Sequence, residues 1–144
     1  SAELCMVGPD SDGSLKVVKQ LAEQLKVSVT FTGKLDKSEW RTLAKAYNVF
    51  INTTNFDNTP VSVIEAMALG LPVVSTNVGG MPYLIEHEKE GLLVNPDDVE
   101  AMTRAILKLY HNHDLVATLT TNARQKVEQF DWEVVKDLWF EVLR

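Results

Sequence analysis

Apolar residues along this chain follow two alternating spacings. Short, nearly continuous apolar or alternating runs are typical of β-strands, and each is followed by glycine, proline, asparagine or another small polar residue. Between these runs, apolar residues recur every three or four positions, as in helices packed on a core. The predicted strands are residues 3–8, 27–32, 49–51, 71–75 and 91–94, and the predicted helices are 15–25, 36–47, 60–70, 82–86, 97–109, 114–129 and 131–143. This order predicts an α/β fold with a mostly parallel, Rossmann-like sheet and helices on both faces.

Several helix ends carry recognisable capping residues. Asp36 and Glu39, and likewise Asp97 and Glu100, have the three-residue spacing of a capping box. Asp131 is placed to cap the last helix. These residues therefore predict where three of the helices begin.

The stretch of residues 55–80, NFDNTPVSVIEAMALGLPVVSTNVGG, is predicted to form a loop, a helix, a strand and a second loop. Thr59 or Asn58 is expected to cap a helix that starts at Pro60 and ends at Gly70. The strand that follows is rich in valine, as strands buried on both faces are. The apolar helix positions expected to face the core are Val61, Ile64, Met67 and Ala68.

Composition narrows the possible functions. The chain has 144 residues, of which 45% are hydrophobic, so one well-packed domain is expected. Its formal net charge is −6, so neither a surface that binds the phosphate backbone of nucleic acids nor a polybasic membrane-binding patch is expected. The single cysteine, Cys5, lies in an apolar run and is expected to be a buried thiol. No apolar run approaches the length of a membrane span, and the start SAELCMVG is no secretory signal. Because a strand begins almost at once, we expect the sequence to be cut from a longer polypeptide.

The carboxyl ends of parallel strands meet at one edge of a sheet, where ligands bind. Glycines and small polar residues dominate the segments expected there, and helix N-termini offer N–H groups to an anion. The helix beginning near Pro60 is the best placed of these, so a phosphate-bearing ligand is plausible. The chain has no Walker pattern and no GxGxxG fingerprint.

Two acids stand out in the central stretch. Glu65 could face the ligand edge of the sheet. Alternatively it could support its own helix, because Ser62 precedes it by three residues, as in a capping box. Asp57 has an alternative explanation too, because aspartate and asparagine are common in turns. Gly79 and Gly80 could likewise form a turn and have no further role. Lys34 is by itself an ordinary loop lysine. The three histidines show no arrangement for a metal, and no metal site is expected.

The central stretch resembles the nucleotide-sugar-binding half of the GT-B glycosyltransferases, specifically the retaining group 1 (family 4) class. That family has an acid, seven residues, a glutamate, Ala-Met-Ala-x-Gly-x-Pro-Val-Val and a Gly-Gly loop. Here Asp57 and seven residues precede EAMALGLPVVSTNVGG. The flanking segments LCMVG, VTFTGKL, YNVFINTTNFDNTP and EGLLVNPDDVEAM agree in order and spacing, so the resemblance covers nearly the whole chain.

The resemblance implies roles for individual residues. Asp57 and Glu65 would be the catalytic-site acids, with Asp57 near the donor sugar and Glu65 accepting hydrogen bonds from the ribose hydroxyls. Backbone N–H groups around Asn58, Thr59 and Val61 would hold the diphosphate. The donor-binding residues implied in this way are Gly33, Lys34, Asn58, Thr59, Val61, Glu65, Gly79 and Gly80. No cofactor or metal would be needed beyond the nucleotide-diphosphate sugar.

Two departures from the family pattern bear on this expectation. Asp57 is followed by Asn-Thr-Pro, where the family usually has glutamate with Gly-Phe-Gly, and this variant is similar to members from surface-polysaccharide pathways. The chain also begins after the family's first strand, whose arginine and nearby lysine bind the diphosphate. The resemblance thus implies a fragment that is inactive alone. The strand at 3–8 would then either pair directly with the strand at 49–51 or leave a sheet edge open for another chain.

We therefore predict that residues 1–144 are the C-terminal donor-binding domain of a retaining glycosyltransferase. The whole enzyme would transfer a sugar to a saccharide or lipid-linked acceptor in the cytoplasm, at or near the inner membrane face. One alternative is a GT-B nucleotide-sugar epimerase, which the AMALG-containing motif disfavours. A second is a non-catalytic module that binds a nucleotide-sugar or a protein partner.

Overall fold

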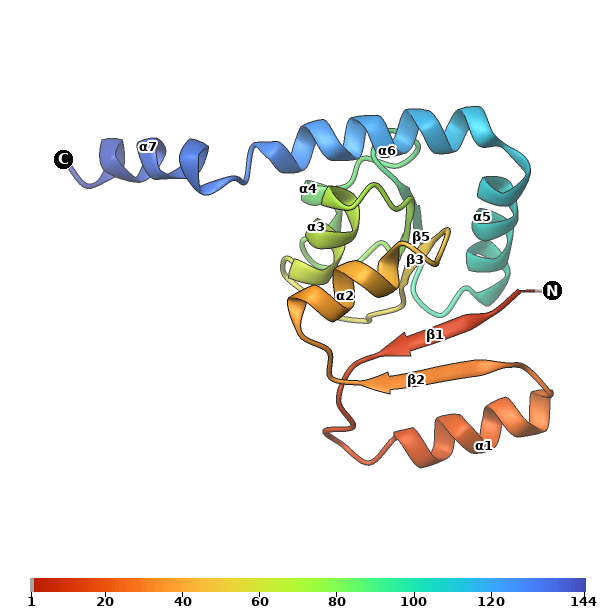
Figure 1. Cartoon of the computed structure of the whole chain (residues 1–144). Coiled ribbons are helices and arrows are strands. Elements are labelled where there is room, and N and C mark those ends of the chain that lie inside the picture. Colours follow the sequence, from red (N-terminus) through yellow and green to blue (C-terminus); the bar gives the residue numbers. More distant parts are fainter. Residues whose placement is uncertain (1) are drawn as a thin grey trace. The chain divides into compact units, whose positions relative to one another are not determined.

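The computed structural model describes residues 2–144, which alternate between strands and helices as predicted (Figure 1). The chain divides into two compact units, Ser1–Leu43 and Ala44–Arg144. The strands are β1 (Leu4–Val7), β2 (Val29–Gly33), β3 (Phe50–Asn52), β4 (Val73–Thr76) and β5 (Leu92–Val94). The helices are α1 (Leu15–Leu25), α2 (Lys37–Ala44), α3 (Val61–Ala68), α4 (Met81–Leu84), α5 (Val99–His111), α6 (His113–Glu128) and α7 (Trp132–Val142).

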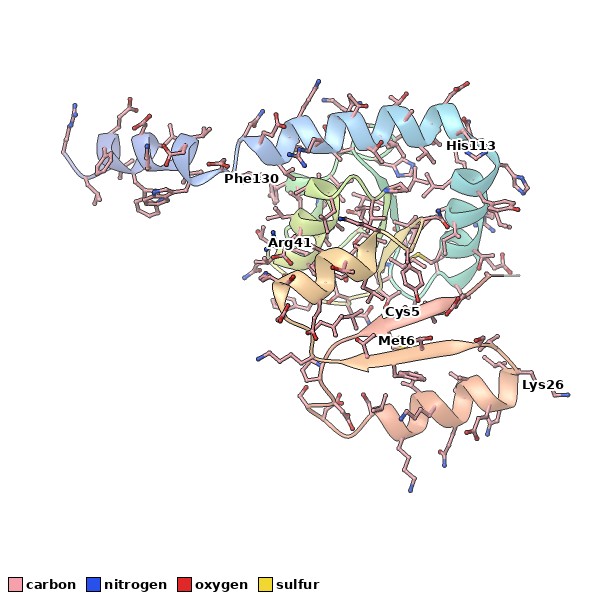
Figure 2. The ribbon with its side chains drawn as sticks, in the orientation of Figure 1. Cys5, Met6, Lys26, Arg41, His113 and Phe130 are labelled. Atoms are coloured by element: carbon pink, nitrogen blue, oxygen red, sulfur yellow. The ribbon has the colours of Figure 1, made fainter. Side chains whose placement is uncertain are left out.

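The first unit is built on a parallel pair of strands, in which Leu4 of β1 lies opposite Val29 of β2. The predicted capping box forms at the start of α2: Asp36 Oδ1 accepts from the Glu39 N–H at 2.8 Å, and Glu39 Oε2 accepts from the Asp36 N–H at 2.8 Å. The expectation that Cys5 is buried is wrong. This side chain on β1 (labelled in Figure 2) is only half-buried, because among residues 2–144 β1 is hydrogen-bonded to β2 alone.

The second unit contains a parallel sheet in the order β3-β4-β5. Successive residues of a strand point to opposite faces, and Val73 and Val74 of β4 are both fully buried, so this strand is covered on both faces as predicted. Within the described residues β3 is hydrogen-bonded to β4 alone. The described strands thus form two separate parallel sheets, one in each unit.

Helices α5 and α6 pack over one face of this sheet. The buried cluster there joins both helices to the strands and contains Val74, Leu92, Val94, Ala105, Leu109 and Leu119. The expected cap at the start of α5 is wrong. The cap is Asp98, whose Oδ1 accepts from the Ala101 N–H at 2.8 Å. Asp97 instead takes a positive φ of 61° in the preceding turn.

Helix α3 ends as the sequence indicates. The Leu71 N–H donates to Ala66 O at 3.0 Å and the Gly70 N–H donates to Met67 O at 3.1 Å, which is a Schellman motif with Gly70 at φ 79°. A left-handed residue is needed there, and glycine adopts that conformation without steric cost.

The start and the core face of α3 differ from the prediction. Pro60 is the N-cap residue and not the first helical one, because its ψ of 115° is extended. The Thr59 hydroxyl donates to Asn58 O at 2.7 Å and caps nothing. Met67 is fully buried as predicted, but Val61 is 61% exposed and Ile64 and Ala68 are only half-buried. The other fully buried residues of the helix are Val63 and Ala66.

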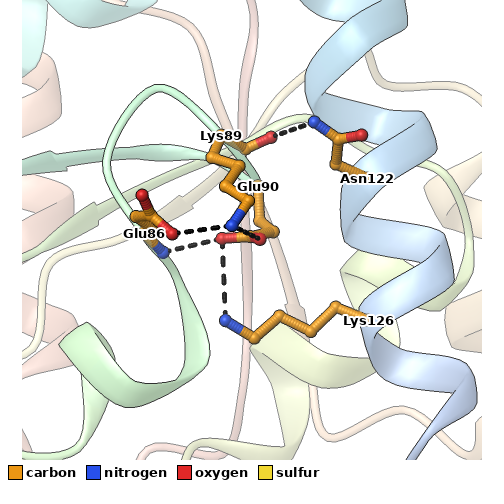
Figure 3. A network of polar contacts seen from close by, with 5 residues as sticks. All are labelled: Glu86, Lys89, Glu90, Asn122 and Lys126. Atoms are coloured by element: carbon orange, nitrogen blue, oxygen red, sulfur yellow. Dashed lines mark hydrogen bonds and ion pairs between the residues drawn. The ribbon is translucent and has the colours of Figure 1, made fainter.

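A buried carboxylate fastens the loop after α4 to α6 (Figure 3). Glu90 is 5% exposed, and its Oε2 accepts from the Glu86 N–H at 2.8 Å and lies 3.6 Å from Lys126 Nζ of α6. Asn122 of the same helix donates to Lys89 O at 2.9 Å. These contacts hold the segment between α4 and β5 against α6 within the second unit.

Helix α7 extends beyond the end of α6 (Figure 1), and none of its residues is buried. It begins where predicted, because Asp131 accepts from the Glu133 N–H at 2.9 Å. Phe130, labelled in Figure 2 at the turn between the two helices, is 47% exposed.

Candidate functional site

Two loops at the carboxyl ends of β3 and β4 meet through their backbones. The Gly80 N–H donates to Asp57 O at 3.0 Å. A Cβ atom on Gly79 would lie 1.9 Å from Asp57 O, and one on Gly80 would lie 1.4 Å from Asn58 O. Only glycine therefore fits at both positions, and the interpretation of Gly79-Gly80 as a simple turn is wrong. The structure brings together four of the predicted site residues here.

The N-terminus of α3 opens directly beside this contact. Pro60 is buried and has no N–H, while the Val63 N–H already donates to Pro60 O at 3.0 Å. Within residues 2–144, no protein group accepts from the N–H groups of Val61 and Ser62. Two donors at the positive end of the helix are thus available to an anion, as an anion-binding site requires.

Glu65 lies in the second turn of α3 and is half-buried. Ser62 is inside the helix and not at its cap, so the alternative of a Ser62–Glu65 capping box is excluded. Residues four apart share one helix face, and helical side chains lean toward the N-terminus. Glu65 consequently lies on the face that carries the exposed Val61, about 6 Å along the axis from it.

Gly33 and Lys34 belong to the first unit. Gly33 ends β2 with φ 71°, and its carbonyl accepts from the Gly8 N–H at 2.9 Å. Both Gly33 and Lys34 are exposed. Their predicted place near the base of the donor stays a prediction.

A group of buried polar side chains behind the Asp57 loop was not predicted from the sequence. Ser75 is fully buried and accepts from Asn52 Nδ2 at 3.0 Å, and the hydroxyl of Thr76, 4% exposed, donates to Thr54 O. Two hydroxyl residues directly after the buried Val73-Val74 pair are the signal that could have indicated them.

A surface groove of about 350 Å³ lies elsewhere in the second unit, between β5 and α5. Its rim carries the ion pair of Glu88 with Lys108, and the hydrogen bond and positive charge of that lysine lower the pKa of Glu88 below 4.5. His87 beside it accepts from the Leu93 N–H at 3.0 Å through Nδ1. This groove includes none of the predicted site residues.

Within residues 2–144, no group of three histidine, cysteine, aspartate or glutamate side chains is arranged to hold a metal ion. No helix in the same range is long and apolar enough to cross a membrane.

Comparison with known proteins agrees with this arrangement. A family model described as "Glycosyl transferases group 1" matches residues 1–112. Sucrose-phosphate synthase 4 of Arabidopsis thaliana is 38% identical over 93 residues, which are 65% of this chain and 9% of that protein. The amylovoran biosynthesis glycosyltransferase AmsK of Erwinia amylovora is 40% identical over 74 residues, which are 51% of this chain and 18% of that protein.

The fold has solved relatives as well. The Anabaena protein HepE, crystallised in complex with UDP-glucose, superimposes with a TM-score of 0.88 at 25% identity, covering 96% of this chain and 40% of HepE. The chain thus spans less than half the length of these three relatives. The family match over residues 1–112 and the shared α/β architecture show that the chain belongs to the group 1 glycosyl transferases, which have the GT-B fold.

Proposed function

We propose that this chain is the donor-binding domain of a retaining glycosyltransferase that uses a nucleotide-diphosphate sugar without a metal. The observation that carries the proposal is the backbone contact of Gly79-Gly80 with Asp57-Asn58 beside the open N-terminus of α3. HepE has been crystallised with UDP-glucose, with UDP, and with UDP and glucose, which supports UDP as the first nucleotide to test.

In this proposal three parts of the site would contact the ribose, the diphosphate and the sugar of the donor, in that order along the ligand. The Glu65 carboxylate would accept hydrogen bonds from the ribose hydroxyls. The N–H groups at Val61 and Ser62 would bind the diphosphate, and Asn58 and Thr59 would border it. Asp57 would lie at the sugar, opposite the backbone of Gly79 and Gly80.

Transfer of the sugar leaves a nucleoside diphosphate whose charge increases as the glycosidic bond breaks. N–H dipoles that are already oriented stabilise this charge without reorganising. In the proposed mechanism the end of α3 therefore assists departure of the diphosphate. The acceptor would be a saccharide or a lipid-linked saccharide in the cytoplasm, and the AmsK likeness supports a role in surface-polysaccharide synthesis.

Calorimetric titration with UDP, GDP and ADP tests the proposal. We expect one nucleotide to bind, and Glu65→Gln to weaken it by about 10- to 100-fold, because charge-assisted hydrogen bonds contribute about 1.5–3 kcal/mol. Glu100→Gln is the matched control, since Glu100 is an exposed helix glutamate that forms an ion pair with Arg104. Equal affinity of wild type and Glu65→Gln would refute the ribose contact.

A further inference from the structure

A chain of hydrogen bonds runs from the buried end of β4 to the loop that carries Asp57. Asn52 and Ser75 are register partners across β3 and β4, and Asn52 Nδ2 donates to Ser75 Oγ at 3.0 Å. Ser75 Oγ in turn lies 3.3 Å from Thr76 O. The Thr76 hydroxyl donates to Thr54 O in the loop after β3. The polar end of the sheet thus contacts the loop directly.

Thr54 also makes hydrogen bonds within the loop that carries Asp57. Its hydroxyl donates to Phe56 O at 3.0 Å and accepts from the Phe56 N–H at 3.4 Å. The next residue is Asp57, whose carbonyl accepts from the Gly80 N–H. The segment 54–57 is therefore fastened at both ends to one continuous segment, 76–80.

The Thr76 hydroxyl has no evident role in packing. Valine fills fully buried positions earlier in the same strand, at Val73 and Val74, and it has the same shape as threonine. Valine could therefore fill the space at position 76 equally well. A buried hydroxyl destabilises a protein unless it makes a hydrogen bond. The bond to Thr54 O is thus what distinguishes threonine from valine at this position.

We infer that Thr76 is a positioning residue for the donor sugar: through Thr54 it sets the place of Asp57, while Gly80 holds the other side of that residue. This inference rests on the proposed function, which puts Asp57 at the sugar. Thr76 does not touch the substrate in this account. Its effect falls mainly on the sugar, because the ribose contact of Glu65 and the diphosphate-binding N–H groups of Val61 and Ser62 belong to α3, which is not part of the 54–57 segment.

The test compares Thr76→Val, Thr76→Ser and Thr103→Val in the full chain. Thr103→Val is the matched control, because Thr103 also donates from its hydroxyl to a backbone carbonyl, Val99 O, but in α5. The ratio of UDP-glucose to UDP affinity is measured by calorimetry for each variant. Amide hydrogen exchange of Gly80 is measured without ligand.

We expect Thr76→Val to lower the affinity ratio and to speed exchange at Gly80, each by about tenfold, because the cost of an unsatisfied buried carbonyl corresponds to roughly that factor. UDP affinity should change less than about twofold. Thr76→Ser should restore both quantities, since it keeps the hydroxyl, and Thr103→Val should match wild type.

An unchanged affinity ratio together with unchanged Gly80 exchange in Thr76→Val would overturn the inference. A ratio that falls equally in Thr76→Ser would also overturn it, because the missing methyl group would then be responsible. Wild-type protein that binds neither ligand would refute the proposed function instead, and Gly80 exchange would still decide whether Thr76 positions the Asp57 loop.

Discussion

Replacing Gly80 by alanine tests the contact between the two loops in isolation. The backbone at Gly80 has φ −83° and ψ −5°, which alanine adopts freely, so no conformational strain is added. The new Cβ atom would lie 1.4 Å from Asn58 O. Because close packing does not tolerate such a distance, the carbonyl and the added atom must separate by about 1.6 Å just to reach 3.0 Å.

A shift of this size also breaks the hydrogen bond from the Gly80 N–H to Asp57 O. Overpacking costs about 1–3 kcal/mol and a lost hydrogen bond adds about 1 kcal/mol, so we expect Gly80→Ala to destabilise the protein by about 2–4 kcal/mol. For a chain of this length that corresponds to a lower Tm by about 6–15 °C. Thermal unfolding followed by far-UV circular dichroism measures it.

Gly70→Ala is the matched control for this experiment. Gly70 has φ 79° and nothing within 4 Å of the added Cβ, so the substitution costs only the left-handed conformation, about 1–2 kcal/mol. We expect amide resonances of residues 57–59 to move in Gly80→Ala and to stay in place in Gly70→Ala. A Gly80→Ala protein that is as stable as Gly70→Ala, with unmoved resonances at 57–59, would refute the loop contact.

Three further predictions concern regions outside the site. Asp131→Ala removes the cap of α7, a helix with no buried residue, and should cost about 1 kcal/mol and raise amide exchange throughout that helix while α6 keeps its protection. Glu90→Ala leaves Lys126 without its buried acceptor and should cost about 2–4 kcal/mol in urea unfolding; an effect below 1 kcal/mol would contradict this. Lys108→Met should return the pKa of Glu88 toward 4.5 in an NMR titration, because the lysine lowers it. Since the folded-state pKa is the lower one, the pair's contribution to stability is complete above 4.5 and is lost as the pH falls through the folded-state value.

Local chemistry explains why some features could be predicted from the sequence. The caps Asp36 and Asp131 and the helix end at Gly70 each depend on a few neighbouring residues. The parallel strands likewise follow from short apolar runs separated by helices. The roles of Asp57 in the loop and Glu65 on the helix as site acids stay predictions.

Other features depend on tertiary structure. Asp97 and Asp98 are chemically equal as caps, and only the positive φ of Asp97 decides between them. A helical period fixes the spacing of apolar residues but not which of Val61 and Val63 faces the core. The contact of Gly80 with Asn58 joins loops from different strands, and no local pattern indicates it.

Mapping UDP-glucose on the isotope-labelled chain by NMR tests the central claim most directly. We predict amide shifts at residues 57–59, Val61, Ser62, Glu65, Gly79 and Gly80, and none around the groove between β5 and α5 at His87 and Lys108. The same titration on Glu65→Gln should lose these shifts at equal ligand concentration. Shifts confined to the β5–α5 groove, or an unchanged response in Glu65→Gln, would contradict a donor site at the N-terminus of α3.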